Sequence, residues 1–170
     1  MLYTERLLLR PFQADDVEDA LAYRDDIEFA RFLPHVPQPF TRQHAEALVE
    51  LNMSEPWEQS PTFAVVRGGT VIGTVNVEVD AGQRSAMLGY AIGRRWWGQG
   101  LTTEAASSAM AWAIEAFDLT RVWAATDTRH TRSQRVMEKL GMRRVKVRLN
   151  DRIGRDGEPF DQIVYEIDLG

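Results

Sequence analysis

The stretch "GRRWWGQGLTTEA", Gly93 to Ala105, carries the strongest fold signal in this chain of 170 residues. A β-rich run ends just before it, and an alanine-rich helical pattern follows it. Gly98 and Gly100 remove side chains at the turn, so backbone N–H groups can approach a phosphate closely. A helix N-terminus adds unpaired N–H donors and partial positive charge. The stretch therefore indicates an anion-binding turn, although a Gly-x-Gly before a helix is also common as a plain tight turn.

The composition is that of one soluble domain, which we expect to span residues 1–170, with 44% apolar and 26% charged residues. The apolar runs are too short for a signal peptide or a membrane span, so we expect a cytoplasmic protein with no membrane partner. Because the chain has no cysteine and only three histidines, none at ligand spacing, we expect no metal. The net charge of −5 argues against nucleic acid as a partner, and it suits either a cationic substrate or simple solubility.

Hydrophobic periodicity predicts strands and helices in mixed order along the chain. Strands are expected over 4–12, 62–67, 70–80, 85–92, 121–126, 142–149 and 161–169. Helices are expected from Asp15, from Thr41 to about Met53, from about Gln99 to Phe117, and over 131–141, where Gly141 ends the helix. The segment 151–160 is expected to be a turn. Such an order predicts an α+β protein, with a twisted sheet covered by helices.

The opening stretch resembles the acyl-CoA-binding motif of the GNAT N-acetyltransferase superfamily, Gln/Arg-x-x-Gly-x-Gly/Ala, because the residues from Arg95 to Gly100 match each fixed position. The longer string "LGYAIGRRWWGQGLTTEA" is similar to the branch of ribosomal-protein N-terminal acetyltransferases, the RimJ/RimL type. Residues 4–16 and 133–142 resemble that branch's opening and its second motif. The resemblance implies the GNAT fold, with a mixed, mostly antiparallel sheet of about six or seven strands and about four flanking helices.

The same resemblance implies acetyl-CoA as the co-substrate. The strands over 85–92 and 121–126 would splay apart around the pantetheine, and backbone amides of 98–102 would hold the pyrophosphate. His130 stands where the branch commonly has Asn, and an imidazole can still make one hydrogen bond there. The implied cofactor-binding residues are Ile92, Arg95, Gly98, Gln99, Gly100, Leu101, Thr102, His130 and Ser133.

Acetyl transfer to an amine needs a base for the amine proton and a donor for the leaving thiolate. Many superfamily members supply that donor from a Tyr at the position of Met137, so Ser133 is the candidate replacement. Tyr90 is the second catalytic candidate, as a group that orients the amine. The Glu that commonly precedes Leu-Gly-Tyr is Met87 here. The base therefore stays open among Glu78, His35 and Glu104, the last of which also complements the helix dipole.

The resemblance implies an N-acetyltransferase that attacks the thioester directly. Its branch points to a protein N-terminal α-amine as the acceptor, and a small amine such as an antibiotic or polyamine is the alternative. Because Met87 and Met137 replace the usual base and acid, a non-catalytic acyl-CoA-binding module and an interaction domain that kept only the fold also stay open. A homodimer is implied as well, in which the last strand either lies at the interface or simply closes the sheet.

Overall fold

The computed structural model describes residues 1–170, and its eight strands form one sheet in the order β1-β2-β3-β4-β5-β6-β8-β7. The strands are β1 (Leu2–Tyr3), β2 (Leu8–Pro11), β3 (Thr62–Arg67), β4 (Thr70–Asp80), β5 (Ser85–Ile92), β6 (Arg121–Asp127), β7 (Arg143–Ile153) and β8 (Pro159–Asp168). The helices are α1 (Val17–Arg24), α2 (Ile27–Ala30), α3 (Arg42–Ser54), α4 (Leu101–Ala116) and α5 (Thr131–Lys139). Every strand pair is antiparallel except β5 with β6.

Local sequence signals fix most of these elements. The predicted strands over 62–67, 70–80 and 85–92 are confirmed as β3, β4 and β5. The side chain of Thr41 caps α3 by accepting from the backbone N–H of His44 at 3.3 Å. Gly141 lies just beyond α5 with φ of +87°, the left-handed conformation that ends helices.

The number of elements differs slightly from the expectation, because two short elements depend on tertiary contacts. The predicted strand over 4–12 is two strands, since Leu2 pairs back onto Leu9 and forms β1 before the chain turns. The extra helix is α2, whose first turn Asp26 caps by accepting from the N–H of Glu28 at 2.9 Å. The α+β fold class itself is confirmed.

The predicted turn over 151–160 was too long. The strand β7 continues to Ile153, and β8 begins at Pro159, so only residues 154–158 turn. Asn150 has φ of +47° in a stretch where the pairing of β7 with β8 shifts register, and its N–H bonds the Asp161 carboxylate at 2.8 Å. This irregularity bends β7 without ending it.

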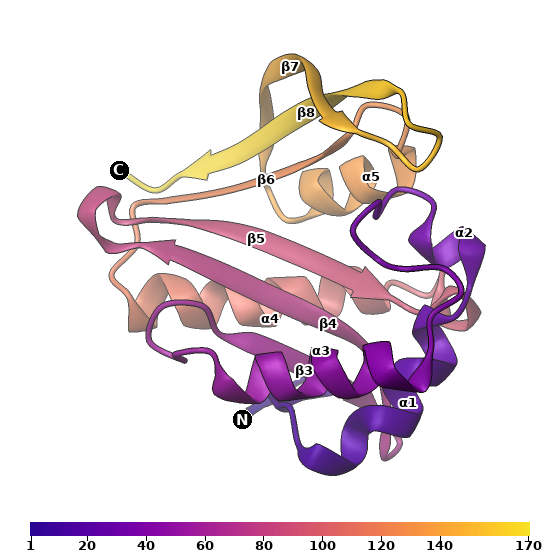
Figure 1. Cartoon of the computed structure of the whole chain (residues 1–170). Helices are drawn as coiled ribbons and strands as arrows, with labels where there is room; N and C mark the ends of the chain where they lie inside the picture. Colours follow the sequence, from indigo (N-terminus) through magenta and orange to yellow (C-terminus); the bar gives the residue numbers. More distant parts are fainter.

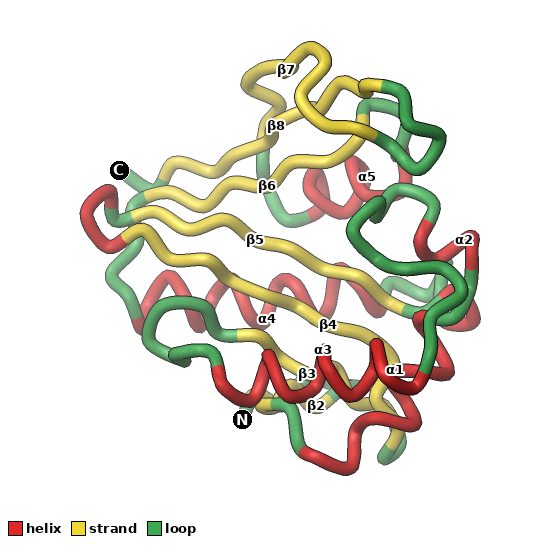
Figure 2. Tube along the Cα trace, viewed as in Figure 1, coloured by secondary structure: helices red, strands yellow, loops and turns green.

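Helices cover both faces of the central strands (Figures 1 and 2). Helix α4 lies behind the sheet, where its alanines pack against the larger hydrophobic core. Helices α1 and α3 lie in front, over a second core that includes Phe12, Tyr23 and Phe40. No helix is both long and apolar enough to span a bilayer.

The sheet opens between β5 and β6. These two strands pair only from Ser85 with Arg121 to Met87 with Trp123, while β5 stays paired with β4 along its whole length. Figure 1 shows β5 and β6 diverging beyond this point, with α5 beside the opening. The splayed strands expected for the pantetheine arm are therefore present.

Candidate active site

The glycine turn has the backbone conformation that its sequence predicts. Gly98 and Gly100 have φ of +74° and +76°, a region that other residues rarely adopt. Helix α4 starts directly afterwards at Leu101, and no side chain caps it. The N–H groups of its first turn therefore lack partners within the helix and are free to bind an anion.

Two arginines that the sequence analysis missed hold this turn. Arg6 donates from Nη1 to the carbonyl of Gln99 at 2.9 Å, and Arg67 donates to Gln99 Oε1 at 2.9 Å. Arg6 also pairs with Glu104 at 2.7 Å. The Gln99 side chain thus serves to fix the turn from outside, and the turn is preorganised by residues far away in the sequence.

Glu104 is a structural anchor for the N-terminal segment rather than a base. Its carboxylate accepts from Thr4 Oγ1 at 2.6 Å, and from the backbone N–H and Nε of Arg6, both at 2.8 Å. Burial alone raises the pKa of this carboxyl, but the bonds from Thr4 and Arg6 outweigh burial and lower the pKa. The Glu104 carboxylate is therefore held ionised, and its oxygens are already hydrogen-bonded to Thr4 and Arg6.

Glu104→Gln is expected to lower the free energy of unfolding by about 1–3 kcal/mol at pH 7. Because the folded pKa is depressed, the stabilisation is present above the ordinary carboxyl pKa of 4.5 and is lost as the pH falls through the folded pKa. Urea unfolding at pH 7 and pH 3 measures the difference, which should be smaller at pH 3 than at pH 7. The matched control is Glu115→Gln on the exposed side of α4; an equal loss in both variants would contradict the anchor.

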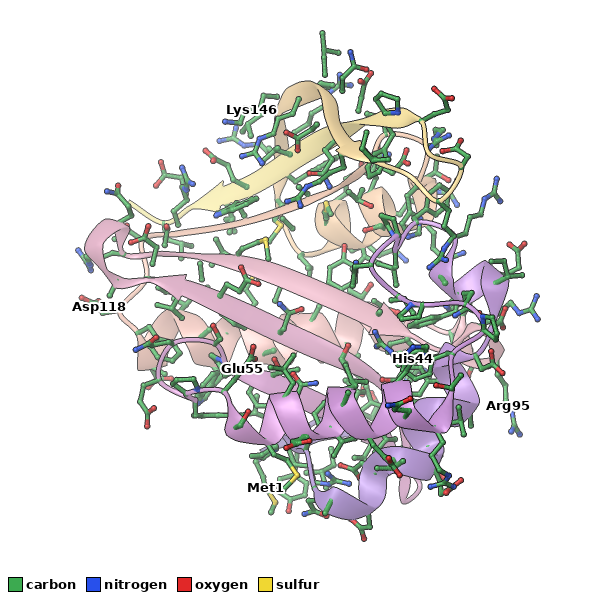
Figure 3. The ribbon with its side chains drawn as sticks, viewed as in Figure 1. Met1, His44, Glu55, Arg95, Asp118 and Lys146 are labelled. Atoms are coloured by element: carbon green, nitrogen blue, oxygen red, sulfur yellow. The ribbon has the colours of Figure 1, made fainter.

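The strand end beside the turn is closed by aromatic and basic side chains. The Trp97 indole N–H donates to the Ile92 carbonyl at 2.7 Å, and the Arg132 guanidinium lies over the Trp97 ring at 3.4 Å from its centre. Arg94 pairs with Asp26 at 2.8 Å. Arg95, by contrast, makes no ion pair and projects into solvent (Figure 3), where it can meet a phosphate. Trp97 thus acts as an anchor for the turn.

Tyr90 and Ser133 meet across the opening between β5 and α5. The Tyr90 hydroxyl donates to the Ser133 carbonyl at 2.9 Å and lies 3.1 Å from Ser133 Oγ. Burial raises the pKa of Tyr90, so the phenol keeps its proton. Met137, where many relatives have a Tyr, lies one helical turn beyond Ser133 and is buried. The two catalytic candidates therefore form one hydroxyl pair beside the position of the missing Tyr.

His130 is packed rather than exposed. Its ring stacks on Phe32, with 4.4 Å between the ring centres and 18° between their planes. Burial, and then the charge of Arg132, lower the pKa of His130 to about 4. The imidazole is therefore neutral near pH 7, and it can still make hydrogen bonds in the place of the branch's Asn.

A cavity of about 680 Å³ lies beside the hydroxyl pair. Its floor is one face of β4 and β5, where Thr74 lies opposite Ala91, Asn76 opposite Gly89 and Glu78 opposite Met87. A β-carbon at Gly89 would lie 2.3 Å from Asn76 Oδ1, so any larger residue there would displace the Asn76 side chain from the cavity floor. A narrow cleft of about 50 Å³ shares Tyr90, His130 and Ser133 with the cavity and reaches Thr102 at the start of α4.

One wall of the cavity is held in place by the turn between β7 and β8, near the end of the chain. Arg155, in the β7–β8 turn, donates to the carbonyls of Ala30 and Leu33, each at 3.0 Å, and to that of Val36. These bonds hold the loop between α2 and α3 against the β7–β8 hairpin. No sequence signal marked Arg155.

Three candidate proton acceptors line the cavity, and they differ in how far other side chains of the protein already bind them. Asp127 is bound by Arg129 at 2.6 Å; burial would raise its pKa, but these bonds lower it. For the exposed His35, partial burial of the ring and the charges of Arg24, Arg155 and Arg152 lower the pKa. Glu78 makes no hydrogen bond or ion pair within the chain. Glu78 is therefore the free carboxylate.

The family model of the "Acetyltransferase (GNAT) domain" matches residues 6–143. The chain belongs to the GNAT acetyltransferases. A curated relative of this acetyltransferase, the uncharacterized N-acetyltransferase YnaD of Bacillus subtilis (strain 168), is 28% identical over 165 residues, which cover 96% of this chain and 94% of the relative. The expectations of the GNAT family and of an acyltransferase enzyme are confirmed.

Solved structures confirm the fold of the acetyltransferase. A ribosomal-protein-S5-alanine acetyltransferase from Vibrio fischeri superposes with a TM-score of 0.84 at 21% identity, over 98% of this chain and 94% of that one. The microcin C7 self-immunity acetyltransferase MccE, in complex with acetyl-CoA and AMP, superposes with a TM-score of 0.89 at 16% identity, over 97% and 93%. Ribosomal-protein acetyltransferases are thus among the structural neighbours, and a neighbour of this fold binds acetyl-CoA.

Proposed function

We propose that this acetyltransferase moves the acetyl group of acetyl-CoA to a primary amine. One observation carries the proposal: the narrow cleft from the start of α4 and the large cavity meet at Tyr90 and Ser133. A donor that enters from the glycine turn and an acceptor that enters from the cavity would therefore meet beside two hydroxyl groups. Holding two reactants together in this way supplies a large share of the acceleration in a direct transfer.

The residues present fit acetyl-CoA, which supplies an acetyl thioester when bound. The free amides after Gly98 and Gly100, with Arg95 beside them, suit the pyrophosphate. Thr102, His130 and Ser133 line the cleft that would take the pantetheine arm. The backbone of Ile92 borders this cleft, although its carbonyl already accepts the Trp97 indole N–H.

The chain's residues supply each proton step of the transfer. The amine nitrogen forms a bond to the acetyl carbon as the carbon–sulfur bond breaks. Glu78, through a water molecule, takes the amine proton. A backbone N–H of the splayed part of β5 steadies the developing oxyanion. The Tyr90 hydroxyl turns from the Ser133 carbonyl and passes its proton through the Ser133 hydroxyl to the departing sulfur, which leaves as a thiol. Tyr90 then regains a proton from water and Glu78 releases the amine proton to water, so the proton balance closes.

For the acceptor, we carry forward the protein N-terminal α-amine, supported by the resemblance to the ribosomal-protein branch and by the neighbour from Vibrio fischeri. A cavity of about 680 Å³ suits the small-amine alternative, as does the likeness to MccE, which was solved with AMP. A cytoplasmic location, a homodimer and a single domain over residues 1–170 stay predictions.

Release of CoA thiol from acetyl-CoA tests the proposal. We expect saturable one-to-one binding of acetyl-CoA by calorimetry, and thiol release that depends on an added amine. The amines to test are peptides with free N-termini, polyamines and aminoglycosides, with product mass as the second readout. Binding without turnover on any amine would favour the non-catalytic acyl-CoA module, and no binding would favour a domain that kept only the fold.

Tyr90→Phe and Ser133→Ala are each expected to lower kcat by about 100-fold while leaving KM for acetyl-CoA nearly unchanged. The effect lies at the low end of general acid catalysis because a thiolate is a weakly basic leaving group. The double variant should lose little more than either single variant, since the two hydroxyls act as a unit. Steady-state kinetics measures all three.

The control is Tyr165→Phe on β8. It removes a hydroxyl that donates to Glu138 at 3.1 Å, and Glu138 lies on α5, the helix that also carries Ser133. It should keep its kcat. Full activity in Tyr90→Phe and Ser133→Ala would remove the hydroxyl pair from the mechanism.

A further inference from the structure

The end of α1 holds a buried arginine whose side chain has no partner. Arg24 is only 7% exposed and makes no ion pair. Its enclosed Nε has no hydrogen-bond partner, and neither has the buried hydroxyl of its neighbour Tyr23, whose pKa the charge of Arg24 lowers against the larger, raising effect of burial. Its backbone carbonyl accepts from Gln38 Nε2 at 2.8 Å and from the backbone N–H of Asp26 at 2.9 Å. A guanidinium has five N–H donors, and burying them unsatisfied is costly.

Arg24 is the exception among the buried charged residues of this chain. The other two, Asp16 and Asp127, are each bound by an arginine, Asp16 by Arg10 at 2.8 Å and Asp127 by Arg129 at 2.6 Å. Around Arg24 stand three aromatic rings, with centres 5.9, 5.5 and 5.5 Å from the guanidinium carbon: Tyr23, Phe29 and Phe40. The faces of these rings attract the positive charge. They do not accept hydrogen bonds from the guanidinium N–H groups, which point outward in the plane of the guanidinium.

The guanidinium also lies at the wall of the large cavity. Arg24 lines it together with Arg152, and the charges of both arginines lower the pKa of His35, so this end of the cavity is positive. The two carboxylates that line the cavity do not pair with Arg24. Asp127 forms an ion pair with Arg129, and Glu78 lies on β4, in the floor of the cavity. The acids next to Arg24 in sequence are engaged elsewhere, Asp25 with the N–H of Phe40 and Asp26 with Arg94. No side chain of the protein neutralises Arg24.

We propose that Arg24 binds an anionic group of the acceptor, so that the substrate is a small primary amine that also carries a carboxylate or a phosphate. This inference rests on the proposed transfer to an amine, and it favours the small-amine alternative over the protein N-terminus as the acceptor. The planar guanidinium fork matches either anion through two parallel hydrogen bonds. The cavity then has two complementary ends, with Glu78 for the amine and Arg24 for the anion.

Anion binding can be tested without turnover. The protein is first saturated with CoA, so that the glycine turn is occupied, and is then titrated with inorganic phosphate or with acetate while the melting temperature is followed. We expect either anion to raise the melting temperature of the wild type, and to have no such effect on Arg24→Met. Arg24→Met should be at least as stable as the wild type without anion, because it removes a buried charge that lacks a partner. The matched control is Arg143→Met, an exposed arginine on β7, which should respond like the wild type.

Two results would overturn the proposal. One is a wild type that does not respond to either anion. The other is an Arg24→Met variant that responds like the wild type but melts several degrees lower, which would make Arg24 a purely structural cation for its three rings. Arg24→Lys guards against a variant that fails to fold: it keeps the charge and loses the planar fork, so it should keep only part of the response.

Matched acceptors distinguish the sources of the anion. The pairs are glycine with glycinamide, phosphoethanolamine with ethanolamine, and peptides that begin with Asp or with Asn. For the pair whose charged member is a substrate, Arg24→Met should raise KM for that member at least tenfold and leave the neutral member unchanged. If Arg24→Met leaves KM unchanged for both members of the pair, the inference is wrong, although the proposed acetyl transfer still stands. Anion binding through Arg24 in a protein that acetylates no amine would instead contradict only the proposed function.

Discussion

Gly98→Val is expected to reduce the affinity for acetyl-CoA at least tenfold. A β-branched residue at φ of +74° is strained by about 1–2 kcal/mol or more, so the turn must change its shape. A β-carbon at Gly98 would meet no protein atom within 4 Å, so the variant should still fold. Loss of binding would then report on the backbone amides that face the ligand. Calorimetric titration with acetyl-CoA measures the change.

The chain offers a matched control in the β7–β8 turn. Gly157 has φ of +80° and equally open surroundings, so Gly157→Val carries the same backbone strain away from the cofactor turn. Gln99→Ala is the second control, because it leaves the backbone of the turn in place and removes only side-chain bonds, to Arg67 and to the carbonyl of Arg95. Both should bind acetyl-CoA nearly as the wild type does. Equal losses in Gly98→Val and Gly157→Val would mean that the turn contributes no specific contacts.

The sequence predicted those elements that local chemistry determines. Alternating valines and the Gly68–Gly69 turn specified β3 and β4 to the residue, and Thr41 and Gly141 marked helix ends. The glycine turn was also predictable, since its left-handed conformations require glycine. In contrast, β1 exists only because Leu2 pairs with Leu9, and a pairing of that kind leaves no periodic signal in so short a segment.

The sequence identified several residues of the site, but it did not predict which of them contact one another. Tyr90 and Ser133 were separate candidates in the sequence, and only the fold joins them as a hydroxyl pair across 43 positions of the chain. Arg6 reaches Gln99 across 93 positions, and Arg155 reaches Leu33 across 122. An arginine has no sequence signature for such long-range roles, because it is common on surfaces and its partner is set by the tertiary structure.

Glu78→Gln is expected to lower kcat by about 100- to 10,000-fold, the range of general base catalysis, with little change in acetyl-CoA binding. Glu78 lies directly opposite Met87 in the β4–β5 ladder, and directly opposed β-carbons are about 5 Å apart. By the resemblance to the GNAT superfamily, the position of Met87 is where a Glu is expected. A carboxylate on the neighbouring strand can therefore reach the same part of the cavity, directly or through one water.

The rate is measured as thiol release with the best amine acceptor, across pH 6 to 9. Because glutamine cannot take a proton, the variant should recover part of its rate at high pH, where more of the amine is already neutral. The control is Glu50→Gln, an exposed change on the outer side of α3, which should keep its kcat at every pH. Wild-type rates and an unchanged pH profile in Glu78→Gln would transfer the role to His35, the other uncommitted group in the cavity, and His35→Asn would then be the variant to lose the rate.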